Sequence, residues 1–129
     1  MQEHPIHVWH RLVRERDARG LDALLDEEAV FLSPVVHTPQ RGKRVTQVYL
    51  SAAFEVFFNP GFRYVREIVG DTDAMLEFET EIDGIYVNGV DLIKWNAAGR
   101  IVEFKVMLRP LKAINVVQQR MAALLQARQ

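Results

Sequence analysis

One carboxylate stands where alternating side chains predict an apolar surface. Asp91 lies in residues 87–108, where apolar and polar residues alternate around the loop 96–99. A short loop closed by glycine between two alternating segments predicts a β-hairpin. Because side chains along a strand alternate between two faces, Asp91 is the one charged residue on its face. The other residues of that face are Val87, Gly89, Ile93, Trp95, Val102, Phe104, Val106 and Leu108.

A carboxyl group in such surroundings should have a raised pKa, because burial disfavours its charged form. Asp91 is therefore our candidate catalytic residue, able to donate a hydrogen bond as a neutral acid or to exchange a proton near pH 7. The alternative is a structural acid whose hydrogen bonds are satisfied by Tyr64, Tyr49, Trp9 or a buried water molecule.

Other polar side chains could orient a ligand beside Asp91. Ser33 precedes a proline, where a serine can contact a ligand or bond the local backbone at a strand end. Tyrosine hydroxyls can do the same, although aromatic residues at core positions more often pack. We predict the ligand-binding residues to be Trp9, Ser33, Tyr49, Tyr64, Phe78, Trp95 and Phe104.

Histidines near the N-terminus do not predict a metal site. His4 and His10 would point about 120° apart on a helix, so three imidazoles with His7 between them cannot converge on one ion. His37 has no nucleophile beside it. The sequence contains no glycine-rich phosphate loop, Ser-His-Asp signature or nucleotide fingerprint. We therefore expect no metal and no cofactor.

The composition limits the classes of partner. The chain has 129 residues, 16 basic and 17 acidic residues, a net charge of -1 and no cysteine. This balance gives no field to attract nucleic acid or an anionic membrane, and the lack of cysteine excludes disulfides and thiol catalysis. No run approaches the length of a membrane span, and the N-terminus lacks a signal-peptide core. We expect one domain over residues 1–129 and a cytoplasmic protein.

The elements that would position Asp91 follow from apolar spacing. Helices are expected over residues 5–19, 21–26, 43–58 and 110–126, with Gly20 ending the first. Strands are expected over residues 29–33, 35–37 and 62–69, with a turn at 38–42. In the strand 62–69, either Phe62, Tyr64 and Ile68 or Val65 and Val69 could face the core, and we favour the aromatic set. The stripe of the last helix is expected to be Leu111, Ile114, Val117, Met121 and Leu124.

The registers of the last three strands place them on one apolar face. Asp83 and Gly84 predict a type I′ turn that sets Leu76 opposite Asp91. In the next hairpin, we expect Asp91 opposite Phe104. Helices followed by strands and one last helix are typical of an α+β fold with a mainly antiparallel, curved sheet.

The opposite face of the sheet also has an apolar centre, within a rim of charged residues. Such a patch resembles an interface, so we predict a homodimer with two-fold symmetry. The alternative is that the last helix covers the patch within one chain. The patch consists of Met75, Val90, Leu92, Ile101 and Met107.

Two segments, SPVVHTPQRG at 33–42 and GVDLIKWNAAGRI at 89–101, resemble the SnoaL-like branch of the nuclear transport factor 2-like superfamily. The resemblance covers nearly the whole chain. It implies a cystatin-like, cone-shaped fold in which a bent sheet wraps around helices and encloses a pocket. Relatives include ketosteroid isomerases, polyketide cyclases, limonene-epoxide hydrolases and dehydratases, while many others do no chemistry.

Asp91 matches the isomerase acid that donates a hydrogen bond to the dienolate oxygen. The position of the isomerase base holds Ser33, and the first helix offers Trp9 and Leu12 in place of the catalytic tyrosine. Two of the three catalytic groups are therefore missing, and we do not expect a ketosteroid isomerase proper. The Asp-Arg-Asp set of the epoxide hydrolases is replaced by Phe78, Thr80 and Val106.

Two functions fit these residues. The first is a protein that binds a small, apolar, oxygenated ligand in a hydrophobic pocket; if it is an enzyme, it is isomerase-, cyclase- or dehydratase-like and uses Asp91. The second is a non-catalytic dimerisation or protein-interaction module. A pocket open to solvent would favour the first function, and an interior filled by Trp9, Phe54 and Trp95 would favour the second.

Overall fold

A computed structural model describes residues 3–127. The helices are α1 (Pro5–Glu15), α2 (Leu21–Leu24), α3 (Lys43–Phe57) and α4 (Leu111–Ala127), with a 3-10 turn at Ala18–Gly20. The strands are β1 (Leu25–Leu32), β2 (Gln40–Arg41), β3 (Arg63–Val69), β4 (Asp73–Ile82), β5 (Ile85–Trp95) and β6 (Ile101–Arg109).

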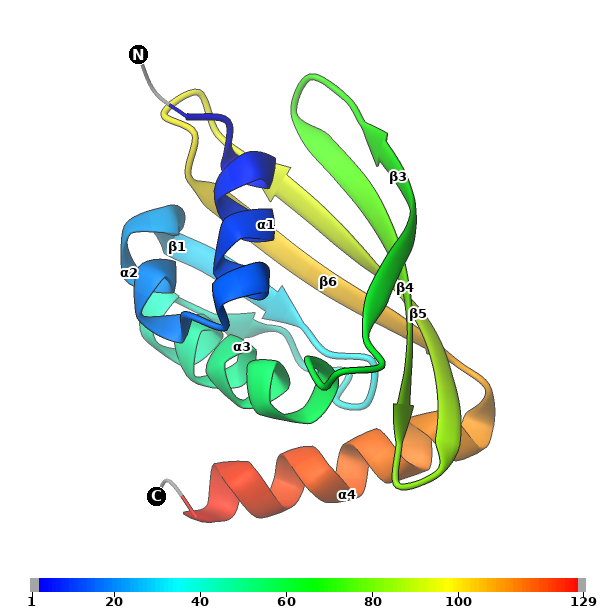
Figure 1. The fold of residues 1–129 in the computed structure, drawn as a ribbon. Helices are drawn as coiled ribbons and strands as arrows, with labels where there is room; N and C mark the ends of the chain where they lie inside the picture. The colour runs from blue at the N-terminus through cyan, green and yellow to red at the C-terminus, as the bar shows by residue number, and fades with distance from the viewer. Residues whose placement is uncertain (1–2, 128–129) are drawn as a thin grey trace.

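The strands form one six-stranded sheet in the order β2-β1-β6-β5-β4-β3. Neighbours are antiparallel except for β1 and β6, which are parallel. The sheet is strongly bent around α1, α2 and α3, while α4 crosses beneath one end (Figure 1). The α+β class with a curved, mainly antiparallel sheet is therefore confirmed.

The core fills the space between the bent sheet and the helices. Its apolar side chains come from every layer, and burying each one from water favours the folded state by roughly 1.5–3 kcal/mol before entropy is counted. The largest fully buried ones include Trp9 from α1, Leu50 from α3, Leu76 from β4, Ile93 from β5 and Phe104 from β6.

The hairpin of β4 and β5 has the predicted register, with Leu76 opposite Asp91 and Phe78 opposite Gly89. The register of β5 with β6 is not as predicted, because Asp91 lies opposite Val106 rather than Phe104. Two single-residue shifts account for the difference: Trp95 pairs with Ile101 rather than with Arg100, and a bulge then gives β6 one extra residue before Glu103 pairs with Lys94. A shift of two residues keeps each side chain on its face, so Phe104 and Val106 still point inward.

The bulge also moves one residue between faces. Ile101, predicted on the outer face, is fully buried, whereas Val102 is only partly buried. The prediction of Ile101 as part of the outer patch was wrong because the alternation of side chains restarts at a bulge. The side chain of Asn96 builds the loop that causes it, by accepting hydrogen bonds from the backbone of Ala98 and Arg100.

Several element boundaries differ from the prediction. The first helix ends at Glu15 and is capped by Arg16, which adopts a left-handed φ of 53°, so Gly20 does not end it. Gly20 instead leaves room for the Leu12 side chain, because a Cβ there would lie 2.3 Å from Cδ2 of Leu12. Residues 35–37 form no strand, and the predicted turn contains the short strand β2.

Two predicted inward residues are exposed. Phe62, just before β3, and Tyr64 on β3 pack against the core as favoured, but Ile68 is 53% exposed because a bulge follows Tyr64. On α4, Leu111 is 72% exposed, and the fully buried residues are Ala113, Val116 and Val117.

The sheet face turned away from α1–α3 keeps an exposed apolar group. Met107 is 54% exposed and Met75, Val90 and Leu92 are half-buried. The last helix does not cover Met107, since its residues Val117 and Met121 line a pocket with Phe31 on the other side of the sheet. No helix within residues 3–127 is long and apolar enough to cross a membrane.

Candidate functional site

Asp91 lies in the middle of β5 with its side chain on the helix-covered face of the sheet. It is 5% exposed, and its cross-strand neighbours are Leu76 on β4 and Val106 on β6. The predicted position of a single acid on an apolar wall is therefore confirmed. An isolated buried carboxylate would be costly, so the partners of its two oxygens decide what it can do.

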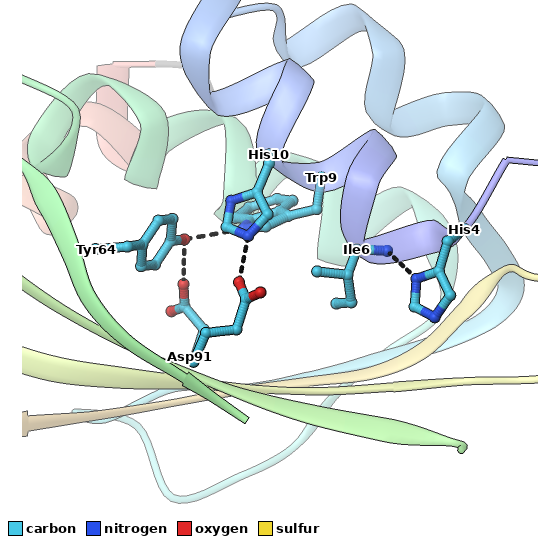
Figure 2. A network of polar contacts seen from close by, with 7 residues as sticks. His4, Ile6, Trp9, His10, Tyr64 and Asp91 are labelled. Carbon is cyan, nitrogen blue, oxygen red and sulfur yellow. Dashed lines mark hydrogen bonds and ion pairs between the residues drawn. The ribbon is translucent and has the colours of Figure 1, made fainter. Parts of the chain in front are cut away.

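One oxygen of Asp91 is held by a short chain of hydrogen bonds. Tyr64 Oη donates to Asp91 Oδ2 at 2.7 Å, and Trp9 Nε1 donates to Tyr64 Oη at 2.9 Å. Figure 2 shows this chain running from α1 through the β3 tyrosine to the β5 acid. The Tyr64 hydroxyl thus acts as an acceptor from Trp9 and as a donor to Asp91. The second hydrogen bond orients the Asp91 carboxyl group within otherwise apolar surroundings.

Burial raises the pKa of Asp91 from 3.8 to about 7, and the hydrogen bond from Tyr64 opposes this rise. Burial also raises the pKa of Tyr64 well above 10, with the charge of Asp91 adding to the effect. Among residues 3–127, the titratable side chain that hydrogen-bonds Asp91 is Tyr64. The helices α1 and α3 and the strand β6 place the non-titratable side chains of Trp9, Phe54 and Val106 around the cavity that Asp91 lines. At neutral pH, Asp91 can therefore be either protonated or ionised, while Tyr64 stays a donor.

The other oxygen, Oδ1, has no hydrogen-bond partner among the described residues, and Asp91 lines a small inner cavity of about 20 Å³. That volume is enough for one water molecule. We call this space the inner cavity. It is lined, besides Asp91, by Trp9, Leu50, Ala53, Phe54, Phe57, Phe58, Phe62, Phe78, Phe104 and Val106.

A larger space of about 260 Å³, the outer pocket, lies between α3, α4 and the loop after β1. Typical ligand pockets begin at about 300 Å³, so it suits a small molecule. Its walls are mostly apolar, and its polar side chains are Ser33, Tyr49 and Gln118. The remaining lining residues are Phe31, Pro34, Val35, Val36, Ala53, Phe57, Val106, Val117, Met121, Ala122 and Leu125.

Five of the seven predicted ligand-binding residues line one of these two spaces, whereas Tyr64 lines neither and contacts Asp91 through its hydroxyl. Trp9, Phe78 and Phe104 line the inner cavity with Asp91, while Ser33 and Tyr49 line the outer pocket. Ser33 Oγ accepts hydrogen bonds from the backbone N–H of Val35 and of Val36, at 3.0 and 3.1 Å. Its local structural role is therefore present, and its hydroxyl proton is still able to reach a ligand.

Trp95 does not belong with the other predicted residues. It lines neither space, and its ring lies edge-on to His4, with the ring centroids 5.1 Å apart. Trp95 lies four positions after Asp91 on β5, and it is not among the residues that line the inner cavity with the acid.

The three N-terminal histidines have separate surroundings. His4 caps α1 by accepting a hydrogen bond from Ile6 N at Nδ1, and its ring lies 5.5 Å from that of His7. His10 pairs with Glu67 of β3 at 2.5 Å. Within residues 3–127, no three His, Asp or Glu side chains form a group able to hold a metal ion.

Sequence reasoning missed two features next to Asp91. The contact between His10 and Glu67 ties α1 to β3, and the His10 ring lies edge-on to Tyr64 at 5.2 Å. Phe57, at the end of α3, lines both spaces. Neither feature has a sequence signal, because each depends on how helices sit on the sheet.

Comparison with solved structures gives close matches. A steroid delta-isomerase from Pseudomonas aeruginosa is 33% identical, with 95% of this chain and 90% of that chain covered and a TM-score of 0.91. An uncharacterised bacterial protein with a cystatin-like fold from Silicibacter pomeroyi is 30% identical, with 92% and 83% covered and a TM-score of 0.85. No protein-family model matches the chain, and no curated protein matches it.

A more distant match extends the range of chemistry found on this fold. The epoxide hydrolase/cyclase-like enzyme SalBIII, involved in pyran ring formation in salinomycin, is 16% identical, with 81% of this chain and 88% of that chain covered. Its TM-score of 0.65 indicates the same fold and nothing about this chain's activity.

Proposed function

This chain belongs to the nuclear transport factor 2-like superfamily, and on that fold we propose that it binds a small, largely apolar molecule whose oxygen contacts Asp91. The observation that carries the proposal is the geometry of Asp91 itself. One of its oxygens is held by Tyr64, while the side chain lines a cavity between apolar walls. A carboxyl group that served only the fold would be expected to have both oxygens bonded within the protein.

The chemistry follows from the raised pKa of Asp91. In its neutral form, the carboxyl group can donate a hydrogen bond to a carbonyl or enol oxygen of the ligand. In its ionised form, it can accept a proton from the ligand. Because the pKa is about 7, one residue can alternate between these states at neutral pH. Isomerase-, cyclase- or dehydratase-like reactions all use such an exchange.

The surroundings disfavour a steroid isomerase mechanism in its usual form. Ser33 stands in the position of the carboxylate base. The first helix, which carries the catalytic tyrosine in the isomerases, here carries Trp9, and Trp9 donates its hydrogen bond to Tyr64. Tyr64 reaches Asp91 from β3, so its hydroxyl orients the acid. We propose that Asp91 is the one ionisable catalytic group, with Ser33 and Tyr49 orienting the ligand from the outer pocket.

A methyl ketone tests whether the ligand oxygen reaches Asp91. We expect 2-octanone to bind the wild-type protein below pH 7 and to lose about tenfold in affinity for each pH unit above that. The Asp91→Asn variant keeps an N–H donor and cannot ionise, so its affinity should not change with pH. Titration calorimetry between pH 5.5 and pH 8.5 measures both. Equal affinity at every pH for the wild-type protein would refute the contact.

Exchange of ketone hydrogens tests for catalysis. An acid that alternates between its two forms should speed the exchange of the α-hydrogens of 2-octanone with deuterium in D₂O. Proton NMR follows the loss of the α-hydrogen signal, and Asp91→Asn is the matched control. Equal exchange rates with both proteins would leave binding as the function.

A second function is favoured by a different observation. The inner cavity is almost filled by aromatic rings, including those of Trp9 and Phe54, which is the arrangement expected of a simple core. At the same time, Met107 is 54% exposed on the outer sheet face, opposite the half-buried Val90. We propose that this face forms a homodimer, which would be the whole function if no ligand binds.

A further inference from the structure

The inner cavity and the outer pocket are separated by a thin wall of three side chains. We infer that the ring of Phe57 is a movable partition in this wall, and that Phe57 determines which ligands can extend from the outer pocket to Asp91. The inference rests on the proposed function and adds to it a residue that selects ligands by length.

The wall consists of the residues that line both spaces, namely Ala53 and Phe57 of α3 and Val106 of β6. Ala53 and Val106 have short side chains, so most of the wall is the Phe57 ring. Val106 lies opposite Asp91 in the neighbouring strand, which places the wall directly next to the acid. A ligand in the outer pocket is therefore kept from Asp91 mainly by one ring.

The backbone of Phe57 is fixed while its side chain has room to move. Asn59 N donates to the Phe57 carbonyl oxygen at 2.9 Å, and Phe57 is the last residue of α3. The ring makes no hydrogen bond that a rotation would break, and one side of it borders the outer pocket of about 260 Å³. A rotamer change into that pocket would join the two spaces without moving the helix.

The position of the ring depends on a glycine in the sheet. Phe57 packs edge-on against Phe78, with the ring centroids 5.6 Å apart. Phe78 lies over Gly89, where a Cβ would be only 2.5 Å from Phe78 Cζ and 2.6 Å from Leu108 Cδ2. The missing side chain at Gly89 lets Phe78 lie low on the sheet, and Phe78 then supports the partition.

This arrangement identifies the class of ligand that can use both spaces. The outer pocket accommodates an apolar chain, and the inner cavity has room for a carbonyl oxygen beside Asp91 once the ring has turned. A ligand with a long enough chain gains contacts in the outer pocket that offset the cost of turning the ring. A short ketone does not, so we expect the affinity to rise steeply with chain length.

Four proteins and one series of ketones test the inference. The ketones are 2-hexanone, 2-octanone and 2-decanone, each labelled with ¹³C at the carbonyl carbon. The variants are Phe57→Leu, which thins the wall, and Ala53→Leu, which thickens it. The control is Phe62→Leu, which makes the same change in the inner cavity and next to the same Phe78, but outside the wall.

We expect Phe57→Leu to bind 2-hexanone about tenfold more tightly than wild type, and Ala53→Leu to bind all three ketones more weakly. Phe62→Leu enlarges the inner cavity without thinning the wall, so it should change the affinity for all three ketones by a similar factor and keep the wild-type dependence on chain length. The carbonyl carbon signal, which moves downfield when the oxygen accepts a hydrogen bond, should move on binding to wild type and Phe57→Leu. Phe57→Met, whose side chain is flexible, replaces Phe57→Leu if that variant does not fold.

The outcomes separate this inference from the proposed function. If the carbonyl signal moves but Phe57→Leu and Phe62→Leu bind every ketone alike, the partition is refuted and the contact with Asp91 stands. If the carbonyl signal moves in none of the four proteins, the proposed function fails, and the partition fails with it.

Discussion

Replacing Asp91 by asparagine should remove a cost that the wild-type protein carries at neutral and alkaline pH. Burial raises the pKa of Asp91 in the folded protein to about 7, whereas an exposed aspartate titrates near 3.8. A difference of one unit corresponds to 1.36 kcal/mol, so full ionisation in the folded state lowers the free energy of unfolding by on the order of 4 kcal/mol.

The sign follows from where the proton binds more tightly. The folded protein holds the proton up to about pH 7, while the unfolded chain loses it near pH 3.8. The contribution of Asp91 is therefore complete below about pH 4. It declines as the pH rises to 7 and is constant above that value. Asparagine has the same shape, can accept the hydrogen bond from Tyr64, and has no such dependence.

Urea unfolding of both proteins between pH 4 and pH 9 measures the difference. Other ionisable groups titrate alike in the two proteins, so subtracting the two free energies of unfolding isolates Asp91. The stability of Asp91→Asn relative to wild type should rise between pH 4 and pH 7 and then stay level. A flat difference over this range would show that Asp91 titrates as an ordinary surface acid, and the proposed proton exchange would then lose its basis.

A loss of stability in Asp91→Asn at every pH, combined with unchanged ketone binding, would show something else. It would assign Asp91 a structural role, with Tyr64 as the partner that the fold requires. The same pair of measurements therefore distinguishes the functional from the structural interpretation of this residue.

Three further predictions concern the surroundings of the site. Tyr64→Phe should raise the pKa of Asp91 further, as followed by NMR titration of the Asp91 carboxyl carbon, and an unchanged pKa would contradict the hydrogen bond. The same variant should lower the free energy of unfolding by about 1–3 kcal/mol, because Trp9 Nε1 loses its acceptor. Gly89→Ala should destabilise the protein by about 1–3 kcal/mol in urea unfolding, since its Cβ would collide with Phe78; wild-type stability would contradict the packing. Met107→Lys should shift a dimer to monomer in sedimentation equilibrium; an unchanged mass would refute the outer sheet face as the interface.

Part of this structure could be predicted because it depends on local patterns. The Asp83-Gly84 turn requires positive φ at both residues, as observed, and fixes the register of β4 with β5 back to Asp91. In the next hairpin, the same reasoning gave the wrong register, because the bulge beside Asn96 leaves no mark in the alternation. The inward face of Phe104 was still correct, since an error of two residues does not change faces.

The candidate site shows the same limit. An acid between apolar neighbours could be recognised from the spacing along β5, and Tyr64 was among the partners considered. The hydrogen bond from Trp9 to Tyr64, which joins residues 55 positions apart, could not be derived from any local pattern. Nor could the position of Trp95, whose ring lies edge-on to that of His4.

The sequence by itself determined that Asp91 faces an apolar layer, because the alternation of a strand is a local property of its backbone. Only the tertiary structure decided how much space lies next to that acid. The cavity depends on the angles at which α1 and α3 cross the bent sheet, and these place Phe57 between Asp91 and the outer pocket. Such angles result from the packing of many side chains from distant segments, and no short segment of the sequence encodes them.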